Sequence, residues 1–282
     1  MSNALGTRQD ELEDLETIGF VASALFDVSA EKINRLRAAF EKNKAFYEDI
    51  AILYQSIKQT AFDRGELPQK SATVTQTVTV AFTSNIRFYG AVNAEVIEAF
   101  TRHMNSGVTS DYIVIGRTGK MLMGNTPDLQ KRSSYYAFTE DEPTEEERRQ
   151  FLKSVAAYSQ VQIFYPSFRN VFNQKVVMQD ITYAPHVETG NEVTLAFDYI
   201  FEPELPKILN FFETKVRYLL FKRVMLESEL SRTAARLIPM NTAQDRSKEE
   251  IIRSRRMMRR KAANFNDLRL LESFSAISKW KK

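Results

Sequence analysis

Residues 205–237 decide the fold, and they read LPKILNFFETKVRYLLFKRVMLESELSRTAARL. Apolar side chains recur there at the three- and four-residue spacing of one face of an amphipathic helix: Leu205, Leu209, Phe212, Val216, Leu219 or Leu220, Leu230, Ala234 and Leu237. No glycine follows Gly190, and the stretch from Glu202 to Lys282 has prolines only at 203, 206 and 239. A helix over this stretch would reach roughly 110 Å at ~1.5 Å per residue, far more than the width of a domain. The sequence therefore predicts a shaft that needs partners along its length.

The N-terminal part predicts a second long helix, ending near Phe62. Two seven-residue ladders run through it, an a/d pattern sustained over six heptads: Leu12, Gly19, Phe26, Ile33, Phe40, Tyr47 and Tyr54, with Leu15, Ala22, Ser29, Leu36, Asn43, Ile50 and Ile57. A coiled-coil helix is one interpretation, and a long helix packed on its own domain is the other. Gly65 and Pro68 close the helix and open a linker.

The middle of the chain alternates between strand and helix patterns. Strands are predicted at residues 73–83, 112–115, 161–165, 176–183 and 192–201, and helices at residues 94–104 and from Pro143 to about Tyr158. Such alternation is typical of an α/β layer with a mainly parallel sheet. We therefore predict an α/β fold in which the N- and C-terminal helices form a long antiparallel coiled coil and a Rossmann-like α/β domain is inserted between them. The predicted divisions are residues 1–65, 66–201 and 202–282.

Composition restricts the possible chemistry. The chain has 282 residues, 43% of them hydrophobic and 27% charged, with a formal net charge of +3, which is ordinary for a globular protein. Cysteine is absent, so disulfides, thiolate metal sites and cysteine nucleophiles are excluded. The two histidines, His103 and His186, lack metal-ligand spacing. No apolar run approaches the ~20 residues of a membrane span, and the acidic N-terminus does not resemble a signal or transit peptide. We expect a reduced, aqueous compartment, and neither a cofactor nor a metal.

Two short motifs resemble ligand sites. The segment from Gly116 to Lys120 invites a phosphate-loop interpretation, but a Walker loop needs a glycine and a hydroxyl where Val114 and Met121 stand. A tight turn after a strand explains it more simply. The acidic run from Glu140 to Glu147 is best explained as a solvated helix start rather than a metal site.

The basic run from Arg253 to Lys261 leaves three interpretations open. It is a solvated helix face, a contact with an acidic protein surface, or a nucleic-acid contact. The last is disfavoured because no aromatic side chain is interleaved to stack on bases.

Several segments, in the same order along the chain, resemble the γ subunit of rotary (F-type) ATP synthases. Thr83-Ser84, Gly90 and Asn93 match that family's Thr-Ser-Asp-Arg-Gly-Leu-Cys-Gly-Gly-Leu-Asn, although its Asp-Arg-Gly core is absent. Ile115 to Gly119 resembles the family's Ile-Gly-Lys-Lys-Gly turn, and Phe164 to Asn170 resembles its Tyr-Asn-Lys-Phe segment. Tyr199 to Pro203 resembles its Tyr-x-Phe-Glu-Pro. The most specific matches are Leu226-Glu227-Ser228, Ser231, Ala234-Ala235-Arg236 and Met240, then Ala243 and Asp245. The N-terminal helix, which is basic in the family, begins acidic here, so the resemblance is to a divergent member.

The resemblance implies a rotor shaft. In that family the two terminal helices form an antiparallel coiled coil inside a ring of alternating α and β subunits, and the α/β domain sits on the membrane rotor ring beside an ε subunit. The asymmetric shaft sets the three catalytic sites in different states and so couples ion-driven rotation to ATP synthesis or hydrolysis on other chains. The resemblance assigns Tyr199, Phe201 and Glu202 to the foot that faces the rotor ring and ε, and assigns Arg256, Arg259, Arg260 and Lys261 to contacts with the catalytic ring. It implies a peripheral protein at the cytoplasmic face of a bacterial-type plasma membrane, with no span and no nucleic acid bound.

The other hypothesis is a free-standing coiled-coil interaction protein, possibly one that binds nucleic acid through residues 253–261. Neither hypothesis gives this chain an active site of its own.

Overall fold

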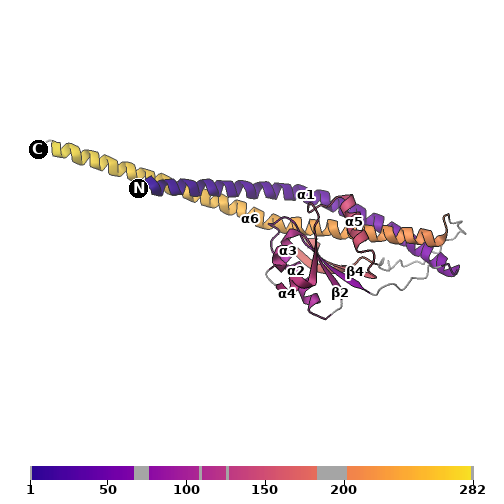
Figure 1. Ribbon diagram of the computed structural model, residues 1–282. Coiled ribbons are helices and arrows are strands. Elements are labelled where there is room, and N and C mark those ends of the chain that lie inside the picture. Colours follow the sequence, from indigo (N-terminus) through magenta and orange to yellow (C-terminus); the bar gives the residue numbers. More distant parts are fainter. Residues whose placement is uncertain (1, 67–75, 108–109, 125–126, 183–201, 281–282) are drawn as a thin grey trace. The chain divides into compact units, whose positions relative to one another are not determined.

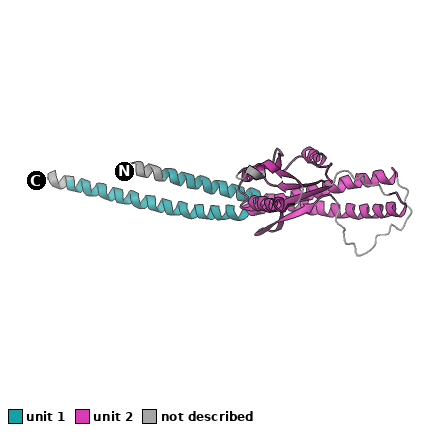
Figure 2. Ribbon diagram, turned by 60° about the horizontal axis from the view of Figure 1, so that its bottom comes forward, with its two compact units in different colours: residues 1–29, 237–282 teal, residues 30–236 magenta. Residues whose placement is uncertain are grey.

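The computed structural model describes residues 2–66, 76–107, 110–124, 127–182 and 202–280 (Figure 1). The chain divides into two compact units, residues 1–29 with 237–282 and residues 30–236 (Figure 2). Helix α1 (Ser2–Asp63) and helix α6 (Leu205–Trp280) each contribute to both units.

The unit of residues 30–236 is built on a five-stranded sheet of order β3-β2-β1-β4-β5. Its strands are β1 (Thr77–Phe82), β2 (Ser110–Ile115), β3 (Ser133–Tyr136), β4 (Gln160–Asn170) and β5 (Asn173–Asp180). Four of them run parallel, because β1 pairs in parallel with both β2 and β4, and β2 with β3. Among the strands that the structure describes, only β5, joined to β4 by a hairpin, is antiparallel. The predicted mainly parallel sheet is confirmed.

Alternation along β1 sends side chains to two cores, one on each face of the sheet. Val78, Val80 and Phe82 face a core shared with α5 (Glu145–Ser154) and with the parts of α1 and α6 in this unit. Ala81 faces the second core, which α2 (Val92–Met104) covers together with α3 (Arg117–Met123). The sheet is therefore a middle layer between the terminal helices and α2.

The terminal helices pair antiparallel within each unit. In the unit of residues 30–236, Lys32 forms an ion pair with Glu229, and the Tyr54 hydroxyl donates to Glu213 at 3.1 Å. Earlier residues of α1 thus meet later residues of α6. The predicted second ladder is the contact face of α1, because Ala22, Ser29, Leu36, Asn43 and Ile57 are all buried. The predicted stripe of α6 is buried at Leu205, Leu209, Val216, Leu219, Leu220, Leu230 and Ala234.

In the unit of residues 1–29 and 237–282 the same pairing continues. Gln244 donates to the Ser23 hydroxyl at 2.8 Å, and Arg255 pairs with Glu16 at 2.7 Å. Gly19 lies so close to α6 that a Cβ there would come within 3.1 Å of Ser247 Cβ. The glycine that interrupts the first heptad ladder therefore marks a close approach of the two helices.

The sequence patterns did not predict three of the observed elements. The turn at Gly116 leads directly into α3, and α4 (Pro127–Arg132) and the edge strand β3 follow. The four residues of β3 are too few for a clear alternation, and the strand lies at the sheet edge. The predicted helix at Pro143 begins two residues later, because Thr144 is the N-cap and forms a reciprocal capping box with Glu147. The strand predicted over residues 192–201 lies outside the described residues.

Candidate functional site

Helix α6 carries a run of buried polar side chains where it crosses the sheet. We call this run the polar seam, and all of its side chains are buried: Glu227, Ser228, Glu229, Ser231, Arg232, Thr233 and Arg236. Burying polar groups costs free energy unless hydrogen bonds or opposite charges compensate. The partners of the seam therefore show what its residues hold in place.

Glu227 fastens α6 to strand β4. Its carboxylate accepts hydrogen bonds from the Tyr165 hydroxyl at 2.9 Å and from the Ser167 hydroxyl at 2.5 Å. Ser231, one turn further along α6, donates to the backbone carbonyl of Ser167 at 3.4 Å. Burial raises the pKa of Tyr165, and the negative charge of Glu227 raises it further, so the phenol remains a donor. The seam thus fixes the position of α6 along β4.

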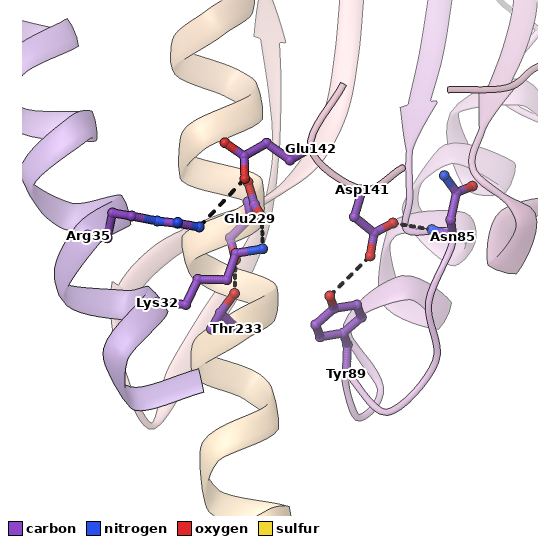
Figure 3. A network of polar contacts seen from close by, with 8 residues as sticks. All are labelled: Lys32, Arg35, Asn85, Tyr89, Asp141, Glu142, Glu229 and Thr233. Atoms are coloured by element: carbon purple, nitrogen blue, oxygen red, sulfur yellow. Dashed lines mark hydrogen bonds and ion pairs between the residues drawn. The ribbon is translucent and has the colours of Figure 1, made fainter. Parts of the chain in front are cut away.

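Glu229 fastens α6 to α1. Its carboxylate forms an ion pair with Lys32, and its backbone carbonyl accepts a hydrogen bond from the Thr233 hydroxyl at 2.7 Å (Figure 3). Burial raises the pKa of Glu229, whereas the hydrogen bond and charge of Lys32 act in the opposite direction. One turn along α1, Arg35 lies 3.8 Å from Glu142 in the segment before α5 (Figure 3). Three separate parts of the chain are therefore joined by charge.

The loop after β1 is held by Asp141. The backbone N–H of Asn85 donates to Asp141, and so does the Tyr89 hydroxyl at 3.1 Å (Figure 3). Burial and the nearby carboxylate raise the pKa of Tyr89 to about 12. Between them, Phe88 adopts a φ of +70°, an unusual conformation for a bulky side chain, and is exposed. The loop is therefore fixed to the segment before α5 rather than free.

Two arginines of the seam pack on aromatic rings of this region. The Arg232 guanidinium lies 5.2 Å from the ring centre of Phe82 and 5.9 Å from that of Tyr89. The Arg236 guanidinium lies 4.2 Å from the ring centre of Tyr89. All three distances suit cation–π attraction, which strengthens when the groups are desolvated.

The glycines of the rejected phosphate loop have a packing role. The Thr83 hydroxyl donates to the carbonyl of Ile115 and accepts from the N–H of Gly119 at 3.0 Å. A Cβ on Gly119 would lie 2.5 Å from Thr83 Oγ1 and 2.8 Å from Val114 Cγ1. Glycine is required there because the start of α3 packs directly on the ends of β1 and β2.

None of the predicted contact residues belongs to the polar seam. Tyr199 and Phe201 fall outside the described residues, and Glu202 is exposed just before α6. The predicted ring contacts are all exposed on the part of α6 that belongs to the unit of residues 1–29 and 237–282: Arg256, Arg259, Arg260 and Lys261. Among the described residues, none of these four forms an ion pair, whereas their neighbours Arg253 and Arg255 pair with Glu250 and Glu16.

Part of the polar seam lies in the segment that resembles the γ family, including Glu227, Ser228 and Arg236, but its role is not evident from the sequence. The available signal was the end of the apolar stripe of α6 at Val224 and Met225, after which Glu227 and Ser228 stand at positions that reach the core. In the part of the chain that the structure describes, no group of three metal-ligating side chains comes together. None of the helices described there is apolar enough over a sufficient length to cross a membrane.

Comparison with known proteins identifies the family. An ATP synthase family model matches residues 8–262, nearly the whole chain. The ATP synthase gamma chain of Psychrobacter arcticus is 21% identical over 242 residues, covering 80% of this chain and 81% of that protein. The chain belongs to the ATP synthase γ family.

Other γ chains and solved structures agree. The γ chain of Solibacter usitatus is 29% identical over 182 residues, which is 61% of each protein. The central stalk of Tetrahymena thermophila mitochondrial ATP synthase superposes with a TM-score of 0.57 at 20% identity, covering 79% of this chain and 99% of that one. A chain of the Euglena gracilis mitochondrial enzyme gives 0.54 at 15% identity, covering 91% and 94%. These two similarities concern the fold, and they confirm the predicted arrangement of two long terminal helices with an inserted α/β layer.

Proposed function

We infer that this γ-family chain is the central-stalk subunit of an F-type ATP synthase or ATPase. The observation that carries the inference is the antiparallel pairing of its own terminal helices around an inserted α/β layer, in a chain that a single ATP synthase family model matches over residues 8–262. Its role is mechanical: ion-driven rotation of the shaft alters the ATP sites of other subunits in turn, and ATP hydrolysis there drives the reverse rotation.

The proposed division of labour follows the helices. Residues 1–65 and 202–282 form the shaft, and residues 66–201 form the foot. The polar seam supports this division, because Glu227 and Glu229 join α6 to β4 and to α1 within one unit. A shaft that transmits torque needs such a rigid connection to its foot.

The proposed partners are the α and β subunits of the catalytic ring, an ε subunit and the membrane rotor ring. Arg256, Arg259, Arg260 and Lys261 would meet carboxylates of the catalytic ring, and their exposure leaves them available for this contact. Tyr199, Phe201 and Glu202 would face the rotor ring and ε. The protein would then lie at the cytoplasmic face of a bacterial-type plasma membrane as a peripheral subunit.

Co-expression with F-type α, β and ε subunits from the same organism tests the assignment. We expect a stable complex that retains the chain through affinity and size-exclusion chromatography and hydrolyses ATP. A ring that assembles and turns over ATP at the same rate without this chain, and that never retains it, would refute the assignment.

A further inference from the structure

Three residues of the polar seam form a stripe of unpaired polar atoms. Ser228, Arg232 and Arg236 occupy positions i, i+4 and i+8 of α6, so they lie on one face of the helix. They are 0%, 1% and 8% exposed. Ser228 Oγ, all three nitrogens of the Arg232 guanidinium and Arg236 Nε find no hydrogen-bond partner among the described residues. We call these three residues the donor stripe.

Burying these donors without acceptors costs free energy unless a bound group accepts their hydrogen bonds. Arginine stays protonated in proteins, and burying its guanidinium costs free energy unless opposite charges and hydrogen bonds compensate. Cation–π attraction to the rings of Phe82 and Tyr89 offsets part of this cost for Arg232. A ring is not a full substitute for oxygen acceptors, and the three guanidinium nitrogens remain without hydrogen-bond partners among the described residues.

The neighbouring carboxylates have other partners. Glu229 pairs with Lys32 and is close enough to Arg232 to feel its positive charge, but it accepts no hydrogen bond from Arg232. Asp141 accepts hydrogen bonds from Tyr89 and Asn85. Glu227 accepts from the hydroxyls of β4. The acceptors missing from the donor stripe are therefore not supplied by the acidic side chains around it.

The stripe also lies at a distinctive place in the sheet. In the order β3-β2-β1-β4-β5 the chain builds outward from β1 to β2 and β3 and then returns to the other side of β1 as β4. The junction of β1 and β4 is thus a topological switch point, where open parallel sheets bind ligands at the carboxyl ends of their strands. Arg232 packs on Phe82, the last residue of β1, and Ser231 bonds to Ser167 near the end of β4.

We propose that the donor stripe is an internal binding site for a small oxyanion of the phosphate class, enclosed between α6 and the carboxyl ends of β1 and β4. The planar guanidinium groups of Arg232 and Arg236 suit the paired oxygens of such an anion, and the Ser228 hydroxyl donates a further hydrogen bond. The bound anion neutralises the buried charge and strengthens the attachment of α6 to the sheet. This site goes beyond the stalk function and does not depend on it.

Titration of the full-length chain with inorganic phosphate tests the proposal directly. Chloride is exchanged for phosphate at constant ionic strength, so that general charge screening stays fixed, and both calorimetric binding and the unfolding temperature are measured. We expect saturable binding of about one phosphate per chain and a rise in unfolding temperature of roughly 5–10 °C at a hundredfold excess over the dissociation constant. Absence of saturable binding by the wild-type chain would overturn the proposal and indicate ordered water alone.

Two variants locate the site. Arg232→Met keeps much of the side-chain volume and removes the charge, so it should abolish the phosphate response. Arg102→Met, at an exposed arginine of α2 in the same unit, should preserve it. A phosphate response that survives in Arg232→Met would overturn the assignment. If Arg232→Met does not fold, Ser228→Ala replaces it, and phosphate binding by Ser228→Ala as tight as that of the wild type would also overturn the assignment. Because every readout uses the isolated chain, failure here leaves the stalk assignment untouched.

Discussion

Lys32 of α1 and Glu229 of α6 form an ion pair in which the Glu229 side chain is 5% exposed and the Lys32 side chain 26%. The pair lies where both helices approach the segment before α5, whose Glu142 lies near Arg35. Burial raises the pKa of Glu229, so desolvation of its charge outweighs the opposing effect of Lys32. A buried pair of this kind contributes less to stability than to the register in which the helices pack.

Removing only one partner of this pair should destabilise the protein strongly. We expect Lys32→Met to lower the free energy of unfolding by about 2–3 kcal/mol, below the ~3–5 kcal/mol typical of fully buried pairs because Lys32 is partly solvated. The double variant Lys32→Met with Glu229→Met should recover most of that loss. Lys207→Met breaks the exposed pair with Glu204 and should cost less than ~0.5 kcal/mol. Urea denaturation measures all of these, and a double variant no more stable than Lys32→Met would contradict the expectation.

The hydrogen bond from Tyr165 to Glu227 should matter far more than a similar bond at the surface. Tyr165→Phe leaves one oxygen of a buried carboxylate without its donor and should cost about 1.5–3 kcal/mol. Tyr158 makes the same type of bond to Asp111 at 2.7 Å in an exposed position, so Tyr158→Phe is the matched control and should cost less than ~0.5 kcal/mol. Equal losses in the two variants would show that Glu227 does not fasten α6 to β4.

Stability should fall in acid partly through Glu147. Hydrogen bonds from Thr139 and Thr144 lower its pKa from 4.5 to about 2. A depressed pKa in the folded state gives stability that is present above pH 4.5 and is lost as the pH falls towards 2. We therefore expect Glu147→Gln to lose less stability than the wild type between pH 5 and pH 2.5, with Glu146→Gln as the control. Parallel pH curves for wild type and Glu147→Gln would contradict this sign.

The exposed basic run should affect coupling rather than folding. Replacing Arg256, Arg259 and Arg260 together by glutamine removes charges that no described residue pairs, so the unfolding temperature should stay unchanged. In the assembled complex, ATP turnover should fall or become uncoupled from rotation, because contacts between the shaft and the catalytic ring are lost. Each such contact is worth ~0.2–1 kcal/mol. Glutamine at Arg102, Arg149 and Lys153 removes the same charge from the α/β layer and is the control. If the basic run instead served nucleic acid, turnover would be unchanged and DNA or RNA binding would be lost.

Periodicity predicted the parts of the fold that bury continuous apolar faces. Leu36 and Ile57 on α1, and Leu209 and Val216 on α6, are buried as their spacing indicates. Strand β3 and the short helices α3 and α4 were missed because four to seven residues contain too few turns or alternations to show a period.

The polar seam could not be derived from local patterns. The buried carboxylate of Glu227 accepts a hydrogen bond from Tyr165, which is 62 positions earlier in the chain. The buried hydroxyl of Tyr89 donates to Asp141, which is 52 positions later. Each side chain alone is compatible with a solvated surface, and only the packing of α6 on the sheet reveals its partner. The family motif pointed to the correct segment of α6 but gave no physical reason for it.

Rotation of this chain inside its complex is the most direct test of the stalk assignment. The chain lacks cysteine, so Lys153→Cys on the exposed face of α5 allows a single probe to be attached while the catalytic ring is fixed to a surface. The account predicts stepwise rotation of the probe in one direction when ATP is added, which stops when hydrolysis is inhibited. A complex that contains the labelled chain and hydrolyses ATP while the probe stays stationary would contradict it.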